Sequence, residues 1–116
     1  MKLKKKAVGR EIGVVDIGSN SVRLVIYEVF GSHFTEIYNE KILAGLGRSL
    51  KSTGKLSEEG KDLTLQALSR FTRIANARNL PPLIFGATAA LREAEDAAHF
   101  LRKIKSETGL KIEPSA

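Results

Sequence analysis

Short apolar runs rich in Val and Ile fill the first third of the chain and predict a β-meander. The runs at about 12–17 and 22–30 are nearly continuous in apolar residues, whereas the run at 34–43 alternates and carries more charge. The segments between them, Gly-Ser-Asn-Ser and Gly-Ser-His, have the composition of turns. We therefore expect three consecutive strands, the first two in the sheet interior with both faces covered and the third nearer an edge.

The apolar period changes to that of a helix in the middle of the chain. Ser57 precedes two glutamates, an order typical of a helix N-cap with acids beside the positive end of the dipole. Apolar residues then recur with helical spacing between 63 and 75, and the Pro-Pro pair at 81–82 ends the helix. A second amphipathic helix is expected between Asp96, a candidate N-cap, and Gly109, a typical C-terminal glycine.

Two shorter apolar segments complete the predicted sheet. Residues 83–86 read as a buried strand that runs into a turn and a helix start, and residues 110–113 read as one more strand. The order predicts an α/β domain with a five-stranded mixed sheet and flanking helices. We place this domain at residues 11–113, between a basic tail at 1–10 and a short tail at 114–116.

Composition and charge narrow the classes of function. The chain has 116 residues and a formal charge of +6. It has no cysteine, which excludes a disulfide framework and a thiolate metal site. It has no apolar run long enough for a bilayer and no secretory signal pattern, and we expect a cytoplasmic protein without a membrane partner. Much of the excess charge lies in the first ten residues, which hold no acid and no aromatic side chain. We interpret them as a solvated terminus, and nucleic acid is not favoured as a partner.

The turn between the first two predicted strands carries the first group of chemically active residues. Asp16 ends an apolar strand, where a carboxylate needs solvent, donors or a cation, and Mg²⁺ would satisfy it. Glycine lets the backbone approach a ligand, short hydroxyl and amide side chains suit phosphate oxygens, and arginine adds a planar charge. The candidate phosphate-binding residues of this turn are Gly18, Ser19, Asn20, Ser21 and Arg23. The same residues also suit a plain hairpin turn in which Asp16 bonds local backbone, and composition alone leaves both interpretations open.

A second group follows the predicted strand at 83–86. In the string Gly-Ala-Thr-Ala-Ala-Leu-Arg, Thr88 can donate to a phosphate or to metal-bound water, and Arg92 follows about one helical turn later. Alone, this string also fits a capped helix start with a surface arginine. Two such loops in one small sheet favour a phosphate site, and we add Thr88 and Arg92 to its candidate residues.

Three strings resemble the N-terminal domain of the exopolyphosphatase/guanosine pentaphosphate phosphohydrolase (Ppx/GppA) family: VVDIGSNSVRLVIYE, LAGLGRSLKSTGKLSEEG and FGATAALREAEDAAHFLRKIKSETGLKIE. The resemblance covers about residues 11–113 and includes the D-x-G-S-N-S-x-R-L and G-[AT]-x-A-x-R patterns in the family's order. It implies an actin-like, ribonuclease-H-like architecture, of which this chain is a half-lobe. It also implies Mg²⁺ at Asp16 and phosphate contacts from the candidate residues of both loops.

The resemblance further implies a function for the parent enzyme, the release of terminal phosphate from inorganic polyphosphate or guanosine pentaphosphate, the latter giving guanosine tetraphosphate. In the family, a strand like 110–113 continues into S-G-x-E-E-A, whose glutamate activates water, and later into a second phosphate loop, Asp-x-Gly-Gly-Gly-Ser. These 116 residues contain neither pattern. We therefore expect no catalytic residue in this chain and no activity from it alone.

Two other interpretations stay open. The chain can be a module that binds phosphate, polyphosphate or a nucleotide without turnover, or a fragment of another actin-like kinase, which the Ser-Asn-Ser-x-Arg extension disfavours. An incomplete lobe should also expose apolar surface, from which we expect self-association.

Overall fold

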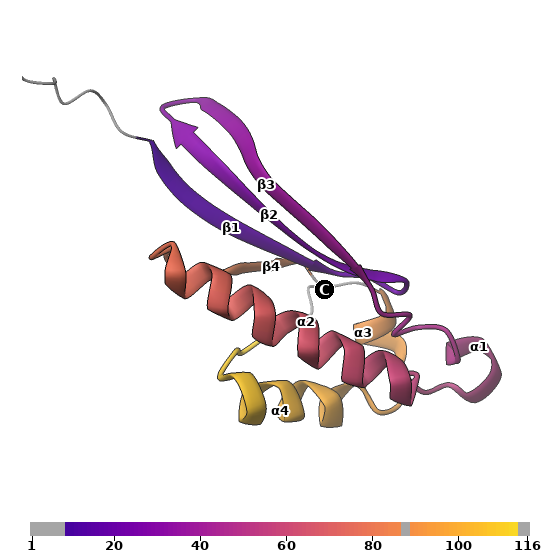
Figure 1. Cartoon of the computed structure of the whole chain (residues 1–116). Coiled ribbons are helices and arrows are strands. Elements are labelled where there is room, and N and C mark those ends of the chain that lie inside the picture. Colours follow the sequence, from indigo (N-terminus) through magenta and orange to yellow (C-terminus); the bar gives the residue numbers. More distant parts are fainter. Residues whose placement is uncertain (1–8, 87–88, 114–116) are drawn as a thin grey trace, which may run out of the picture.

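The computed structural model describes residues 9–86 and 89–113. Its elements are β1 (Arg10–Ile17), β2 (Ser21–Phe30), β3 (His33–Leu43), α1 (Leu50–Thr53), α2 (Glu58–Ala77), β4 (Ile84–Gly86), α3 (Ala89–Glu93) and α4 (Ala97–Thr108). Figure 1 shows a twisted sheet with α2 on one side of it and α4 beyond α2. A mixed sheet with flanking helices is the arrangement that the sequence predicts.

The sheet has the strand order β3-β2-β1-β4. The first three strands form an antiparallel meander, and β4 returns parallel to β1 after the crossover through α2. The predicted interior positions of β1 and β2 and the edge position of β3 are confirmed. Because β4 pairs with the end of β1, the two loops that carry the candidate residues begin at neighbouring points of the sheet.

The expected fifth strand at residues 110–113 is not formed within the described part of the chain. Gly109 ends α4 with φ 79°, and the N–H of Leu110 donates to Thr108 Oγ1 at 3.1 Å. Ile112 is nevertheless buried, with 5% of its surface exposed. Among the described residues the segment is therefore held by burial of a side chain and not by a backbone ladder.

One face of the sheet packs against the helices and forms the core. The side chains of β1 and β2 on this face are fully buried: Val15, Ile17, Val22, Leu24 and Ile26. Phe71 of α2 and Phe100 of α4 are buried with them. On the opposite face Ile12 and Val14 are half-buried and Ile84 is 52% exposed. Val25 on that face is buried, with 9% of its surface exposed, so the prediction that both faces are covered holds only in part for the described residues.

The longest described helix, α2, is amphipathic along its 20 residues. None of the helices in the described ranges combines the length and the apolar character that a membrane crossing requires.

Gly60, in the first turn of α2, is where the loop after β3 meets the helix. A Cβ atom at Gly60 would lie 2.7 Å from Leu46 Cα and 2.8 Å from the carbonyl oxygen of Gly45. The Ser57 hydroxyl accepts the Gly60 N–H at 3.0 Å, which confirms the predicted N-cap. The loop therefore packs directly on helix backbone, and glycine is needed at position 60 for this approach.

Lys61 joins the N-terminal ends of α2 and α4. Its ammonium group lies 2.7 Å from Asp96 Oδ2 and 2.9 Å from Glu58 Oε2, and its side chain is 11% exposed. Asp96 also accepts the N–H of Leu56 at 3.0 Å. Its side chain thus makes no cap bond to α4, contrary to the sequence prediction, because it holds the segment before α2. Burial alone raises the pKa of Asp96, but the hydrogen bonds from Lys61 and Leu56 outweigh burial and lower it.

Replacing Gly60 by alanine is expected to lower the free energy of unfolding by about 1–3 kcal/mol, because the added methyl group overlaps backbone atoms. Helix propensity alone predicts the opposite sign, a gain of about 1 kcal/mol. Urea unfolding followed by circular dichroism measures the difference. The control is Gln66→Ala at an exposed position of α2. A stabilised Gly60→Ala protein would contradict the contact between loop and helix.

Asp96→Asn is expected to lower the free energy of unfolding at pH 7 by about 1–3 kcal/mol, because a charged hydrogen-bond partner of Lys61 is lost. Since the folded-state pKa of Asp96 is lowered, its contribution is present above about pH 4 and is lost as the pH falls through that pKa. The stability of the variant should therefore depend less on pH below about pH 4.

Urea unfolding at a series of pH values tests the role of Asp96. Glu58→Gln is the control, because Glu58 meets the same ammonium group but is 86% exposed; a change within about 0.5 kcal/mol is expected. The same acid dependence in wild type and Asp96→Asn would exclude the stabilising ion pair.

Candidate phosphate-binding site

Asp16 lies next to the end of β1 with its side chain exposed. In the sheet it is the partner of Arg23 in β2 and of Gly86 in β4. A Cβ atom at Gly86 would lie 3.4 Å from Asp16 Oδ1, so the carboxylate lies against the end of β4. The structure thus brings the first loop together with the strand end from which the second loop starts.

The carbonyl groups of the turn between β1 and β2 are bonded to the loop after β3. The Ser19 carbonyl accepts the N–H of Gly47 at 2.9 Å, and the Asn20 carbonyl accepts the N–H groups of Ala44 and Gly45, both at 3.0 Å. A Cβ atom at Gly47 would lie 2.1 Å from Ser19 Oγ, so the two segments touch closely. The loop therefore fixes the conformation of the turn.

Two donor groups of the same turn have no partner among the residues that the structure describes. The Gly18 N–H bonds back to the Ser21 carbonyl at 2.8 Å, but the N–H groups of Ser19 and Asn20 have no acceptor within the described ranges. The side chains of Ser19 and Asn20 are exposed, and Ser21 is half-buried. A turn with its carbonyls bonded and its N–H groups unpaired suits an anion. This arrangement favours the phosphate interpretation over a plain hairpin turn.

Arg23 projects from β2 on the same face of the sheet as its partner Asp16. Its guanidinium donates to Asn39 Oδ1 of β3, and Asn39 Nδ2 in turn donates to Glu36 Oε2 at 3.0 Å. No carboxylate of the described residues forms an ion pair with Arg23. A neutral amide therefore orients the guanidinium, which keeps most of its N–H donors for a ligand.

The second predicted loop is only partly visible. Thr88 lies outside the described residues, so its phosphate contact stays a prediction. Arg92 is exposed near the end of α3, while the neighbouring Ala90 and Leu91 are buried and anchor that helix in the core. The role of Arg92 in a shared cleft likewise stays a prediction.

Asp16 is a single carboxylate. Among the residues that the structure describes, no three Asp, Glu or His side chains gather into a metal cluster. Mg²⁺ commonly binds through one or two carboxylates together with substrate phosphates and several waters. One exposed carboxylate next to the turn at 18–21 fits that mode, and it does not fit a cage made of protein ligands alone.

Sequence reasoning missed two basic residues beside the turn. A hollow of about 520 Å³ opens next to the turn at 18–21, the candidate phosphate turn, and its lining consists of Asn20, Ser21, Lys41, Leu43, Gly45 and Arg48. Lys41 could not be assigned to this place because the register of β3 decides which of its side chains face Arg23. Arg48 belongs to the glycine-rich loop, whose contact with the turn only the fold reveals.

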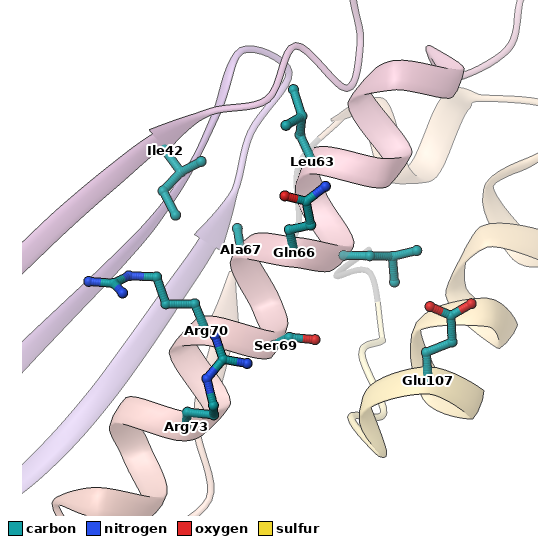
Figure 2. A pocket seen from close by; sticks show the side chains of 9 residues that line it. Ile42, Leu63, Gln66, Ala67, Ser69, Arg70, Arg73 and Glu107 are labelled. Atoms are coloured by element: carbon teal, nitrogen blue, oxygen red, sulfur yellow. The ribbon is translucent and has the colours of Figure 1, made fainter.

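A second hollow, of about 490 Å³, lies along α2 between β3 and α4. Arg70 reaches from α2 toward the sheet (Figure 2), where its Nε donates to Glu40 Oε2 at 2.8 Å. Hydrogen bonds from Arg70 and Tyr38 lower the pKa of Glu40. This hollow contains no residue of the two predicted loops, and its Arg70 already has a carboxylate partner. We therefore place the candidate site at the turn between β1 and β2.

Known proteins that are similar to this chain identify its family. Residues 25–113 match the model of the Ppx/GppA phosphatase family. Exopolyphosphatase 1 of Mycobacterium tuberculosis is 31% identical over 103 residues, which are 88% of this chain and 30% of that protein. A bifunctional 3-dehydroquinate synthase/phosphatase of Fusobacterium nucleatum is 31% identical over 105 residues, 84% of this chain and 16% of that protein.

Solved structures show the same relationship. A Ppx/GppA family member of Aquifex aeolicus superposes with a TM-score of 0.86 at 31% identity, over 91% of this chain and 35% of that one. An exopolyphosphatase from Cytophaga hutchinsonii gives 0.82 at 28% identity, over 90% and 34%. The chain thus spans roughly a third of these proteins or less, and the predicted actin-like fold is confirmed. With a family model that matches most of its residues, the chain belongs to the Ppx/GppA phosphatase family and corresponds to its N-terminal domain.

Proposed function

We propose that this chain binds the terminal phosphates of inorganic polyphosphate or guanosine pentaphosphate, as one half of the cleft of a phosphoanhydride hydrolase. The turn at 18–21 carries the proposal: its carbonyls are bonded to the loop after β3, while the N–H groups of Ser19 and Asn20 are unpaired in the described ranges beside Asp16 and Arg23. The relatives named exopolyphosphatases support polyphosphate as the substrate class.

The described groups suit binding and charge neutralisation. The unpaired N–H groups can bond phosphate oxygens without reorganising the turn, and Arg23 adds a fixed positive charge. We propose that Asp16 holds Mg²⁺ when a phosphate chain is present; the ion would neutralise charge on the phosphate oxygens. A general base is not among these groups, and the sequence has no S-G-x-E-E-A segment. The proposal for the 116-residue chain alone is therefore binding without turnover.

Arg23→Gln is expected to weaken the binding of long-chain polyphosphate about tenfold, because a charged hydrogen bond is worth about 1.5–3 kcal/mol and solvent exposure reduces that value. Isothermal titration calorimetry of the whole chain at one fixed ionic strength measures the change. Arg102→Gln removes the same charge from an exposed position of α4 and serves as the control. Equal losses in both variants would mean general attraction of a polyanion and would contradict the site.

The variant Asp16→Asn distinguishes the contribution of Mg²⁺ to polyphosphate binding from the contribution of the direct phosphate contacts. Mg²⁺ is expected to strengthen polyphosphate binding by the wild type, and this gain should disappear in the variant. Binding without Mg²⁺ should be unchanged or stronger, since a negative charge is removed. Phosphate release from polyphosphate is measured in parallel. Turnover by the wild-type chain that Asp16→Asn abolishes would overturn the proposal of binding alone.

Self-association of the isolated chain stays a prediction. The described residues expose large apolar side chains, among them Phe34 at 63% and Leu43 at 70%. Sedimentation velocity is expected to show the sedimentation coefficient rising with protein concentration. A compact monomer at all micromolar concentrations would contradict this prediction.

A further inference from the structure

The hollow beside the phosphate turn is a basic pocket formed by two segments. The turn supplies Asn20 and Ser21, and β3 with the loop after it supplies Lys41, Leu43, Gly45 and Arg48. This lining includes two cationic side chains and no carboxylate. The pocket is continuous with the phosphate turn, because Asn20 and Ser21 belong to both.

Lys41 is placed in the pocket by the register of the sheet. Arg23 is the ladder partner of Asp16 on one side and of Lys41 on the other, so these three side chains form a row across one face. Two cations directly opposite each other disfavour the ladder. Within the described ranges Lys41 forms no ion pair that would relieve this repulsion. A bound anion would relieve it.

Arg48 reaches the pocket across Gly45. A Cβ atom at Gly45 would lie 2.4 Å from Arg48 Nη2, so the guanidinium lies directly on the loop backbone. Its Nη1 donates to Glu59 Oε1 at 3.2 Å, in a pair with side-chain exposures of 61% and 70%. An exposed pair of this kind contributes little to stability. Arg48 can therefore turn from Glu59 to an anion in the pocket at small cost.

The lining also indicates the chemical class of the occupant. It has no aromatic side chain on which a nucleobase could stack, and Leu43 is its single apolar side chain. Cations, an amide and a hydroxyl are suited to phosphate oxygens. The pocket therefore fits a further part of a phosphate chain better than it fits a guanosine.

We propose that Lys41 and Arg48 form a second phosphate subsite, which binds phosphate groups farther along a chain whose end occupies the turn at 18–21. This inference rests on the proposed function of the turn and assigns its neighbouring pocket to inorganic polyphosphate. The subsite makes affinity depend on chain length, because a short phosphate ligand fills the turn alone.

The test compares pyrophosphate with long-chain polyphosphate by isothermal titration of the whole chain. The double variant Lys41→Gln/Arg48→Gln is expected to lose about tenfold or more in affinity for long-chain polyphosphate, with pyrophosphate affinity changed less than about twofold. Arg102→Gln/Lys103→Gln removes two charges from exposed positions of α4 and should not change the ratio of the two affinities. Arg23→Gln should weaken both ligands.

The outcomes separate the subsite from the turn. In one outcome, wild type binds both ligands, Arg23→Gln weakens the binding of both, and Lys41→Gln/Arg48→Gln behaves like the control pair. The proposal of a second subsite is then wrong, and the proposed function of the turn stands. If wild type binds neither ligand, both proposals fail. A loss of pyrophosphate affinity in Lys41→Gln/Arg48→Gln equal to the polyphosphate loss would also overturn a separate subsite.

Glu59→Gln gives a second measurement with the opposite sign. It frees Arg48 from its carboxylate partner, and polyphosphate affinity should rise about two- to fivefold, the equivalent of an exposed ion pair. Glu58→Gln in the same helical turn is the control, because Glu58 pairs with Lys61 instead. Unchanged affinity in Glu59→Gln, or an equal rise in the control, would contradict the role of Arg48.

Discussion

The site depends on the close packing of three backbone segments. The loop at 44–47 lies between the first turn of α2 and the turn at 18–21, and it approaches Gly60 on one side and Ser19 on the other. Its N–H groups bond the carbonyls of the turn, which leaves other N–H groups of the turn unpaired in the described ranges. The hydrogen bonds between the loop and the turn are made by backbone atoms, and the close approach of Gly47 also involves the Ser19 side chain. A movement of the loop away from α2 would therefore also disturb the turn. The donor pattern of the turn at 18–21 is thus a consequence of helix packing.

Polar groups at the N-terminal ends of the helices also hold the loop at 44–47 in place. The Leu46 carbonyl accepts the N–H of Ser57, and the N–H of Leu56 bonds to Asp96, which also pairs with the nearly buried Lys61. A buried carboxylate is stabilised only when such partners are present. The ends of α2 and α4 and the loop at 44–47 are therefore fixed by one network. It lies on the α2 side of the loop, whereas the turn at 18–21 lies on the other side, so it can position the turn without contacting an anion bound there.

The features that were predicted correctly from the sequence are those that depend on residues close to one another in the chain. The three strands, the Ser57 cap, the Gly109 helix end and the glycine-containing turn at 18–21 depend on neighbouring residues, and the structure has all of them. The role of Asp96 was predicted wrongly because its partners are 35 and 40 residues away. Lys41 was missed because only the strand register decides which residue faces Arg23. Among the described residues no strand forms at 110–113, because apolar composition alone does not supply a backbone ladder.

The two arginines of the candidate site differ in the partners that an anion would have to replace. Arg23 is oriented by the neutral amide of Asn39, so a phosphate meets a charge that no carboxylate of the described residues has neutralised. Arg48 is paired with Glu59, and a ligand must compete with that carboxylate for it. The proposed contact with Arg23 would therefore be preorganised, whereas the proposed contact with Arg48 would require a ligand long enough to reach it. If the proposed subsite binds a phosphate chain, chain length would be sensed by the exchange of one exposed ion pair for another, and such pairs are weak enough to remain reversible.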